Sequence, residues 1–151
     1  LLALETGKSP NVSKLAETID TSRATVMNYI KYLADARLLN IIYHQGSVFP
    51  KKPAMVVVNN PNLIYTVYPR NFGDREILNS FFINQLRKDH TVNKERATDA
   101  YRIDGEPSVR ISAEGEGESR ARGKKNYYTA SSGLVVGKGR KIPLWIFGFL
   151  Y

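Results

Sequence analysis

Apolar side chains recur at helical spacing near the beginning of the chain. One face of a helix is indicated by the spacing of Val12, Leu15, Ala16 and Ile19, which fall three or four residues apart. Residues 9–11 read Ser-Pro-Asn, and they supply a proline that a first helical turn tolerates and side chains that can cap the helix. We therefore predict a short helix directly after this stretch.

A second helix is predicted after a break at Asp20-Thr21-Ser22, because Ser22 is a residue type that caps helices. Its apolar face consists of Val26, Tyr29, Ile30 and Leu33. The turn between the two helices spans only about three residues, as a helix-turn-helix requires. We expect Val26, Ile30 and Leu33 to fix the buried side of this helix.

Two strand-like runs follow, at Leu38–Tyr43 and Ala54–Val58. The segment between them, residues 44–53, is polar and rich in turn formers, and it contains Lys51 and Lys52. Two strands around a basic loop, placed after a recognition-type helix, are typical of the wing of a winged helix-turn-helix. We expect this module to end at residues 59–62, which read Asn-Asn-Pro-Asn.

The rest of the chain has a different pattern. An amphipathic helix is predicted from Asp74 to His90, with an apolar side made of Ile77, Leu78, Phe81, Phe82 and Leu86. Strands are predicted at Ala100–Ile103, Ser108–Ser112 and Tyr127–Ala130, and the first two are close enough in sequence to form a hairpin. The stretch from Glu114 to Lys125 has no apolar period and is interpreted as a mobile loop. The apolar tail, Ile142 to Tyr151, is expected to be buried, because it would otherwise form a large exposed patch.

The charge favours polyanionic partners. The chain has 22 Lys and Arg against 14 Asp and Glu, which gives a net charge of +8 and a pI near 9.7. Many soluble basic proteins nevertheless bind nothing anionic. There is no cysteine, so disulfides and thiolate metal sites are excluded, and a reducing, cytoplasmic setting fits this composition. No run is apolar for the roughly 20 residues that a membrane-spanning helix needs.

The strongest chemical signal is the outward face of the second helix. A recognition helix places its N-terminal, exposed side chains in the major groove, where Arg can read guanine and Asn can read adenine. Lysines on this helix and at the tip of the wing can contact phosphates. The predicted DNA-binding residues are Arg23, Ala24, Met27, Asn28, Lys31, Lys51 and Lys52. The alternative is that the module only packs against a neighbouring domain.

The sequence gives little support for ATP binding, for a catalytic triad or for base stacking by aromatic residues. Gly137-Lys138-Gly139 is too short for a phosphate-binding loop and lacks the strand–loop–helix setting, so we expect this chain by itself not to bind ATP. No spacing of Ser, His and Asp suggests a catalytic triad. Tyr127, Tyr128 and Trp145 have rings that can stack on bases, but aromatic residues in strand-like runs more often belong to the core. We predict no catalytic residue, no metal ligand and no cofactor within this chain.

Four stretches of the chain resemble one family of bacterial proteins. They read KLAETIDTSRATVMNYIKYLADARLLN (residues 14–40), NNPNLIYTV (59–67), NSFFINQLRKDH (79–90) and KIPLWIFGFLY (141–151). The chain resembles the C-terminal part of AAA-type ATPases that are abundant in gut Bacteroidetes. In that family an ATPase domain is followed by a winged helix and a DUF4143 domain, which is similar to the PD-(D/E)xK nuclease fold.

The resemblance implies that the site for ATP and magnesium lies in a domain upstream of Leu1, which opens this sequence inside an apolar stretch. We accordingly expect the sequence to be a fragment that ends at a natural C-terminus. The partners it implies are duplex DNA and the upstream ATPase domain, with a homo-oligomer as a further option and no membrane.

The resemblance also permits a comparison with nuclease sites, in which carboxylates and a lysine converge on a metal ion. Asn79 stands where the family's core helix carries Glu, and Ala100 stands where a strand carries Asp. Asp99 is one residue away, which reverses its face on a strand. The Glu of the next strand falls on Arg110 or Ser112. We expect Asn79, Ala100 and Ser112 to cluster without holding a metal, which implies an inactive nuclease fold.

We predict an α/β (α+β) chain in two parts, a winged helix-turn-helix at residues 1–60 and a small degenerate nuclease-like mixed-sheet domain at residues 61–151. The predicted function is DNA binding and domain coupling within an AAA-type ATPase. Two alternatives stay open. One is an active metal-dependent nuclease that uses Asp99, Asp104 or Glu106, and the other is a module that binds only proteins.

Overall fold

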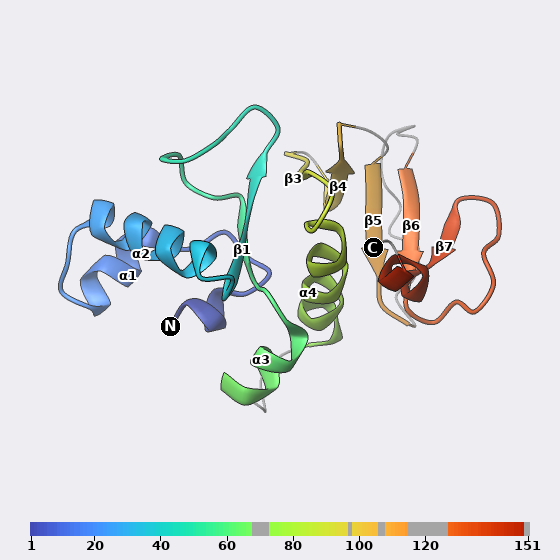
Figure 1. Cartoon of the computed structure of the whole chain (residues 1–151), viewed down its shortest axis with the longest axis horizontal. Coiled ribbons are helices and arrows are strands. Elements are labelled where there is room, and N and C mark those ends of the chain that lie inside the picture. Colours follow the sequence, from blue (N-terminus) through green and yellow to red (C-terminus); the bar gives the residue numbers. More distant parts are fainter. Residues whose placement is uncertain (68–72, 97, 106–107, 115–126, 150–151) are drawn as a thin grey trace.

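The computed structural model describes residues 1–67, 73–96, 98–105, 108–114 and 127–149. The helices are η1 (Leu2–Glu5), α1 (Val12–Thr18), α2 (Arg23–Asp35), α3 (Pro61–Val67), α4 (Asp74–Leu86) and η2 (Leu144–Phe149), where η marks a 3-10 helix (Figure 1). The strands are β1 (Leu39–His44), β2 (Met55–Val58), β3 (Val92–Lys94), β4 (Ala100–Ile103), β5 (Ser108–Ser112), β6 (Tyr127–Ser131) and β7 (Lys141–Pro143). Nearly all of the loop predicted from Glu114 to Lys125 lies outside the described residues.

The two N-terminal helices begin where capping side chains stop the preceding chain. The side chain of Asn11 accepts a hydrogen bond from the backbone N–H of Lys14 at 3.1 Å, and that of Ser22 accepts one from Thr25 at 3.1 Å. Each bond satisfies one of the donors that a first helical turn leaves unpaired. The helix predictions for this region are confirmed, with residues 19–22 as the turn.

All the strands named above join in one mixed sheet of seven strands, in the order β2-β1-β3-β4-β5-β6-β7. The pairs β1/β3, β5/β6 and β6/β7 are parallel, and the others are antiparallel. The expected pairing of β4 with β5 is confirmed, with Tyr101 opposite Val109. A mixed α/β class is therefore established.

Strand β2 is buried on both of its faces. Val56 packs with Val26 and Ile30 of α2, whereas Met55 and Val57 belong to a core that α4 covers. Successive side chains of a strand point to opposite faces, so one short strand serves both cores. On its outer edge the backbone of Val56 bonds to Gly7 and Lys8.

The main core lies between α4 and the sheet. Phe82, Ile83 and Leu86 of α4 are at most 1% exposed, and they belong to one core with buried residues of six strands, β1 to β6, among them Ile42 and Tyr101. Figure 1 shows α4 running across the middle of the sheet, with α1 and α2 at one end of the molecule and β7 at the other.

The predicted boundary near residue 60 falls inside this shared architecture. β1 pairs with β3 at Tyr43 and His44, and Ile42 contributes to the same core as Phe82. The prediction of two separate domains would require each part to fold without the other, and it stays a prediction. In the folded chain the sheet and the core both run across the boundary.

Two helix predictions need correction. Residues 59–62 do not simply end a module: Pro61 begins α3, and the side chain of Asn60 accepts a hydrogen bond from the backbone of Asn62 at 2.9 Å. Proline suits a first helical position, so the same letters that indicate a turn here start a helix. In the opposite sense, α4 ends at Leu86 rather than at His90: the backbone N–H of Asp89 bonds to the carbonyl of Leu86, three residues back, instead of to the carbonyl four residues back that a continuing α-helix uses.

The expected burial of the apolar tail is correct for only some of its residues. Leu144 and Phe147 are buried, but Trp145 is 51% exposed and Phe149 is 66% exposed. The tail forms the 3-10 helix η2, in which residues three apart lie on the same side. Only one side of η2 therefore faces the core, and residues 150–151 lie outside the described part.

Candidate nucleic-acid interface

The sequence of α2 separates a buried side from an exposed N-terminal side. Val26 and Ile30 are 3% and 0% exposed, and they pack against α1 and Val56. Arg23, Ala24 and Asn28 are exposed to solvent. Ser22 caps the helix, so Arg23 and Ala24 occupy its first turn, which is where a recognition helix contacts bases.

Two of the residues predicted to contact DNA, Met27 and Lys31, already have contacts within the chain. Met27 is only partly exposed, because it packs against the core formed with α1. The ammonium group of Lys31 lies 2.8 Å from a carboxylate oxygen of Asp35, one helical turn further on. The hydrogen bond to Asp35 raises the pKa of Lys31. Lys31 therefore stays charged, but a phosphate would have to compete with Asp35 for it.

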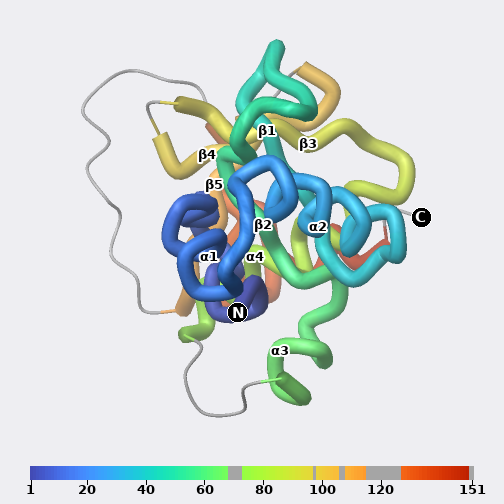
Figure 2. The backbone as a smooth tube through the Cα atoms, turned by 90° about the vertical axis from the view of Figure 1, so that its left-hand side faces the viewer, coloured from blue at the N-terminus to red at the C-terminus, as the bar shows by residue number. Residues whose placement is uncertain are grey.

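The loop between β1 and β2 is held by several hydrogen bonds. The backbone of Ser47 donates to His44 and that of Lys51 to Val48, each at 3.0 Å, and the hydroxyl of Ser9 donates to the carbonyl of Pro53 at 3.0 Å. Lys51 and Lys52 are exposed on this loop, as predicted. Figures 1 and 2 both show the loop above the pair α1 and α2.

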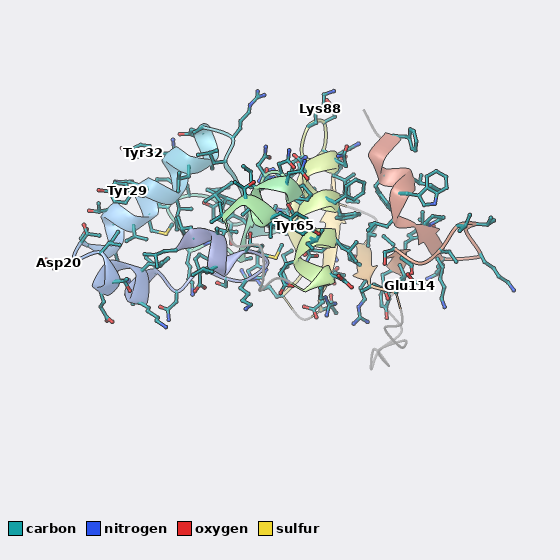
Figure 3. All side chains as sticks on the ribbon, turned by 90° about the horizontal axis from the view of Figure 1, so that it is seen from below. Asp20, Tyr29, Tyr32, Tyr65, Lys88 and Glu114 are labelled. Atoms are coloured by element: carbon teal, nitrogen blue, oxygen red, sulfur yellow. The ribbon has the colours of Figure 1, made fainter. Side chains whose placement is uncertain are left out.

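A groove of about 600 Å³ lies on another side of α2, between this helix, η1 and α3. Its lining is apolar and includes Leu2, Leu33 and Leu39. Tyr29 and Tyr32 are 48% and 61% exposed at the groove, so Tyr29 does not share the burial of Val26 and Ile30. Figure 3 shows Tyr29 and Tyr32 projecting from α2.

The two described carboxylates of the nuclease alternative, Asp99 and Asp104, do not converge. Asp99 precedes β4 and Asp104 follows it, so the strand separates them by about 16 Å at the usual rise per residue. Asp104 accepts a hydrogen bond from the backbone of Thr91 at 2.8 Å and lies 2.6 Å from a ring nitrogen of His90. Glu106 is outside the described residues. Among the described residues, no three His, Cys, Asp or Glu side chains lie close enough to hold a metal.

The expected cluster of Asn79, Ala100 and Ser112 is not formed. Asn79 lies on α4 and accepts a hydrogen bond from the hydroxyl of Tyr101 at 2.9 Å. Tyr101 and Ile111 point toward α4, and alternation along β4 and β5 turns Ala100 and Ser112 to the opposite face of the sheet. The residue-by-residue alignment with the nuclease family, which placed Ala100 and Ser112 beside Asn79, is therefore wrong for β4 and β5.

A polar cavity of about 200 Å³ instead surrounds Asn79. It lies where the segment before α1 meets the first half of α4 and the strands β3 to β5. Its charged lining residues are Lys8, Arg75, Glu76, Lys94 and Asp99. Apart from Asn79 and Asp99, no residue of this cavity was singled out from the sequence, because they come from segments that only the fold brings together.

A second polar cluster, on the opposite face of the sheet, was also missed. The side chain of Glu95 is 5% exposed, and its carboxylate accepts hydrogen bonds from Arg102, Thr98 and Ser108 at 3.0, 2.7 and 2.6 Å. A buried carboxylate needs such partners. The cluster joins β3, β4 and β5, so its role is to hold these strands in register.

Comparisons of the chain with protein-family models, with curated proteins and with solved structures found no match. Within the described residues, no helix is long and apolar enough to cross a bilayer.

Proposed function

We propose that residues 1–60 act as a winged helix-turn-helix that binds duplex DNA, and that the chain couples this binding to an AAA-type ATPase domain lying upstream. The observation that carries the proposal is the exposed N-terminal side of α2 beside a lysine-bearing loop. Arg23 and Asn28 supply the two side-chain types that read guanine and adenine in the major groove. Arg23, Ala24 and Asn28 on that side of α2 are all exposed.

The charges near α2 support contacts with the DNA backbone. Lys51 and Lys52 are exposed on a loop that hydrogen bonds hold in place, and they can contact phosphates beside the groove. Lys31 pairs with Asp35 at the surface, and exposed pairs of this kind contribute little to stability. A phosphate can therefore replace Asp35 as the partner of Lys31 at small cost. In this proposal the contacts come chiefly from Arg23, Asn28 and the loop lysines.

The second part of the chain is proposed to be a nuclease-like domain without nuclease activity. Its helix α4 and mixed sheet support a general likeness to such folds, and Asp99 and Asp104 lie too far apart to share a metal ion. The ATP and magnesium site of the whole protein belongs, in this proposal, to the upstream domain.

One observation favours protein contact as a second function. The apolar groove beside α2 is lined by Leu1, Leu2 and Ala3 together with α2 and α3 residues, and binding sites are commonly concave and mostly apolar. Any segment preceding Leu1 would leave the fold at this groove. The upstream ATPase domain is therefore its proposed occupant, which would couple that domain to the DNA-binding helix.

The DNA proposal is tested by measuring the affinity of the chain for a mixed-sequence duplex by fluorescence anisotropy at several salt concentrations. We expect binding that weakens steeply with salt, because bound phosphates release counterions. Replacing Arg23 and Lys51 together by Ala should reduce affinity at least tenfold and flatten the salt dependence.

The matched control replaces Lys88 and Lys138 by Ala, because both are exposed lysines and the charge lost is the same. Lys88 follows α4, and Lys138 lies between β6 and β7, at the opposite end of the molecule from α2 (Figure 1). Equal affinities of the two double variants would mean that binding is a general effect of the net charge, and the proposal would be wrong. Incubation of the same duplex with the chain and magnesium should leave it intact. Cleavage that Asp99→Ala abolishes would favour the nuclease alternative.

A further inference from the structure

The polar cavity around Asn79 is open to a hydrogen-bond donor of a side chain that is otherwise nearly buried. Asn79 is 8% exposed, and its carbonyl oxygen accepts the hydrogen bond from Tyr101. No described residue accepts a hydrogen bond from its amide nitrogen, which lies 3.9 Å from the position a Cβ would take on Gly7, another cavity residue. The two N–H groups of Asn79 therefore face the cavity.

Tyr101 fixes this orientation. It is 2% exposed, and burial raises the pKa of its phenol, with Asp99 raising it further and Arg75 opposing the rise. The phenol therefore stays protonated and donates to the carbonyl oxygen of Asn79. The sulfur of Met55, 3.6 Å from the same hydroxyl, is only a weak acceptor, so the hydroxyl bonds best to the amide oxygen, and this orientation places the N–H groups of Asn79 on the cavity side.

Lys94 supplies a second donor, which makes no hydrogen bond to any described residue. Its side chain is 22% exposed, and its ammonium nitrogen lies 3.6 Å from Asp99 and 5.7 Å from the centre of the Tyr101 ring. A charge-assisted hydrogen bond is about 2.7–2.9 Å long, so the contact with Asp99 is an ion pair without one. Among the described residues, no group accepts a hydrogen bond from this ammonium, whose three N–H groups require acceptors.

The charges and the size of the cavity favour a small anion. Three cations, Lys8, Arg75 and Lys94, face two carboxylates, Glu76 and Asp99. The volume of about 200 Å³ is below the roughly 300 Å³ at which pockets for drug-sized ligands begin, so a single ionised group fits better than a whole nucleotide. The donors of Asn79, Lys94 and Lys8 come from three separate segments. Donors from three directions suit a tetrahedral oxyanion better than a planar carboxylate.

We propose that this cavity binds one phosphate group, with Asn79 and Lys94 donating hydrogen bonds to its oxygens and Lys8 closing the mouth electrostatically. The phosphate belongs either to a nucleic-acid strand or to a small phosphate compound. The site is distinct from the surface of α2, so it goes beyond the proposed DNA contact and does not depend on it.

The test follows the side-chain amide signal of Asn79 by NMR in the ¹⁵N-labelled chain during titration with inorganic phosphate, with sodium chloride at equal ionic strength as the reference. We expect a saturable shift with phosphate only. Asn79→Leu, which has no amide signal, is read from the backbone amides of Gly7 and Lys94. Both Asn79→Leu and Lys94→Met should weaken binding at least tenfold, and Lys94→Met keeps the aliphatic stem in case the first variant fails to fold.

Lys88→Met is the matched control, because Lys88 lies beyond the end of α4 and away from the cavity, and it should bind phosphate like the unaltered chain. Arg23→Ala combined with Lys51→Ala should also leave phosphate binding unchanged, which separates this site from the α2 surface.

A short oligonucleotide that shifts the same signals at lower concentration than phosphate would identify a nucleic-acid strand as the source, whereas phosphate binding alone would identify a small compound. Absence of a saturable shift, or an equal affinity in Lys94→Met, would overturn the proposal.

Discussion

Asp99 and Asp104 lie at the two ends of β4, and their surroundings give them different roles. Asp99 is 58% exposed and takes part in two long ion pairs, to Lys94 at 3.6 Å and to Arg75 at 3.9 Å. Asp104 has closer partners, and it adopts a left-handed backbone conformation with φ of 50°. The hydrogen bond from the backbone of Thr91, followed by that of His90, lowers the pKa of Asp104. Asp104 thus helps to fix the turn after α4.

This pKa shift predicts how stability depends on pH. A carboxyl whose pKa is lower in the folded chain than in the unfolded chain stabilises the fold above the unfolded pKa, and this contribution is lost as the pH falls through the folded value. Asp104→Asn should therefore lower the Tm at pH 7, and the difference from the unaltered chain should shrink below about pH 4. Asn tolerates a positive φ, so the backbone is not strained by the change.

Thermal unfolding at several pH values provides the measurement. Asp89→Asn is the control, because Asp89 is also exposed and lies near the same turn. A Tm difference for Asp104→Asn that stays constant between pH 7 and pH 3 would show that the effect does not come from ionisation.

At the scale of elements, α2 is the helix whose start and buried side follow most directly from neighbouring residues in the sequence. The cap at Ser22 and the apolar spacing of Val26 and Ile30 are local signals, and they place Arg23 and Asn28 on the exposed side. The pairing of Lys31 with Asp35 is also a local signal, because residues four apart are neighbours on a helix. It could have been predicted from the sequence. The partial burial of Met27 depends on α1 and could not.

The stabilising effect of the N-terminal cap of α2 can be measured. Ser22→Ala should destabilise the chain by about 1 kcal/mol, because the backbone N–H of Thr25 loses its acceptor. Ser13→Ala is the matched control, since Ser13 is exposed inside α1 and caps nothing, and Ala favours a helix. The free energy of unfolding from urea titrations gives both values. Equal effects of the two substitutions would mean that Ser22 does not stabilise the start of α2.

At the scale of the whole molecule, the two parts of the sequence share a core. β2 is covered by α2 on one face and by α4 on the other, and β1 pairs with β3 across the predicted boundary. Ile42, Met55 and Val57 are completely buried, and they lose their cover when the second part is removed. The exposed side of α2 and the polar cavity are thus parts of one folded unit.

Removal of the second part should therefore unfold the first. Burial of each large apolar side chain stabilises a fold by about 1.5–3 kcal/mol, so exposure of Ile42, Met55 and Val57 costs about 5–9 kcal/mol. That is comparable to the whole stability of a typical domain, about 5–15 kcal/mol. A fragment of residues 1–60 should show little helical circular dichroism and no cooperative melting, unlike the full chain. A cooperative transition in this fragment would show that it folds independently, as the two-domain division predicted from the sequence requires.

The sequence alone determined the features that depend on a few neighbouring residues. The caps at Asn11 and Ser22, the apolar period of α1 and α2, and the hairpin of β4 and β5 all follow from short-range spacing. The tertiary structure decided what joins distant segments: the parallel pairing of β1 with β3, the burial of β2 on both faces, and the cavity that brings Lys8, Asn79 and Lys94 together. The physical reason is that a local pattern states which face of an element is apolar. It does not state which of several apolar faces, far apart in the chain, will cover it.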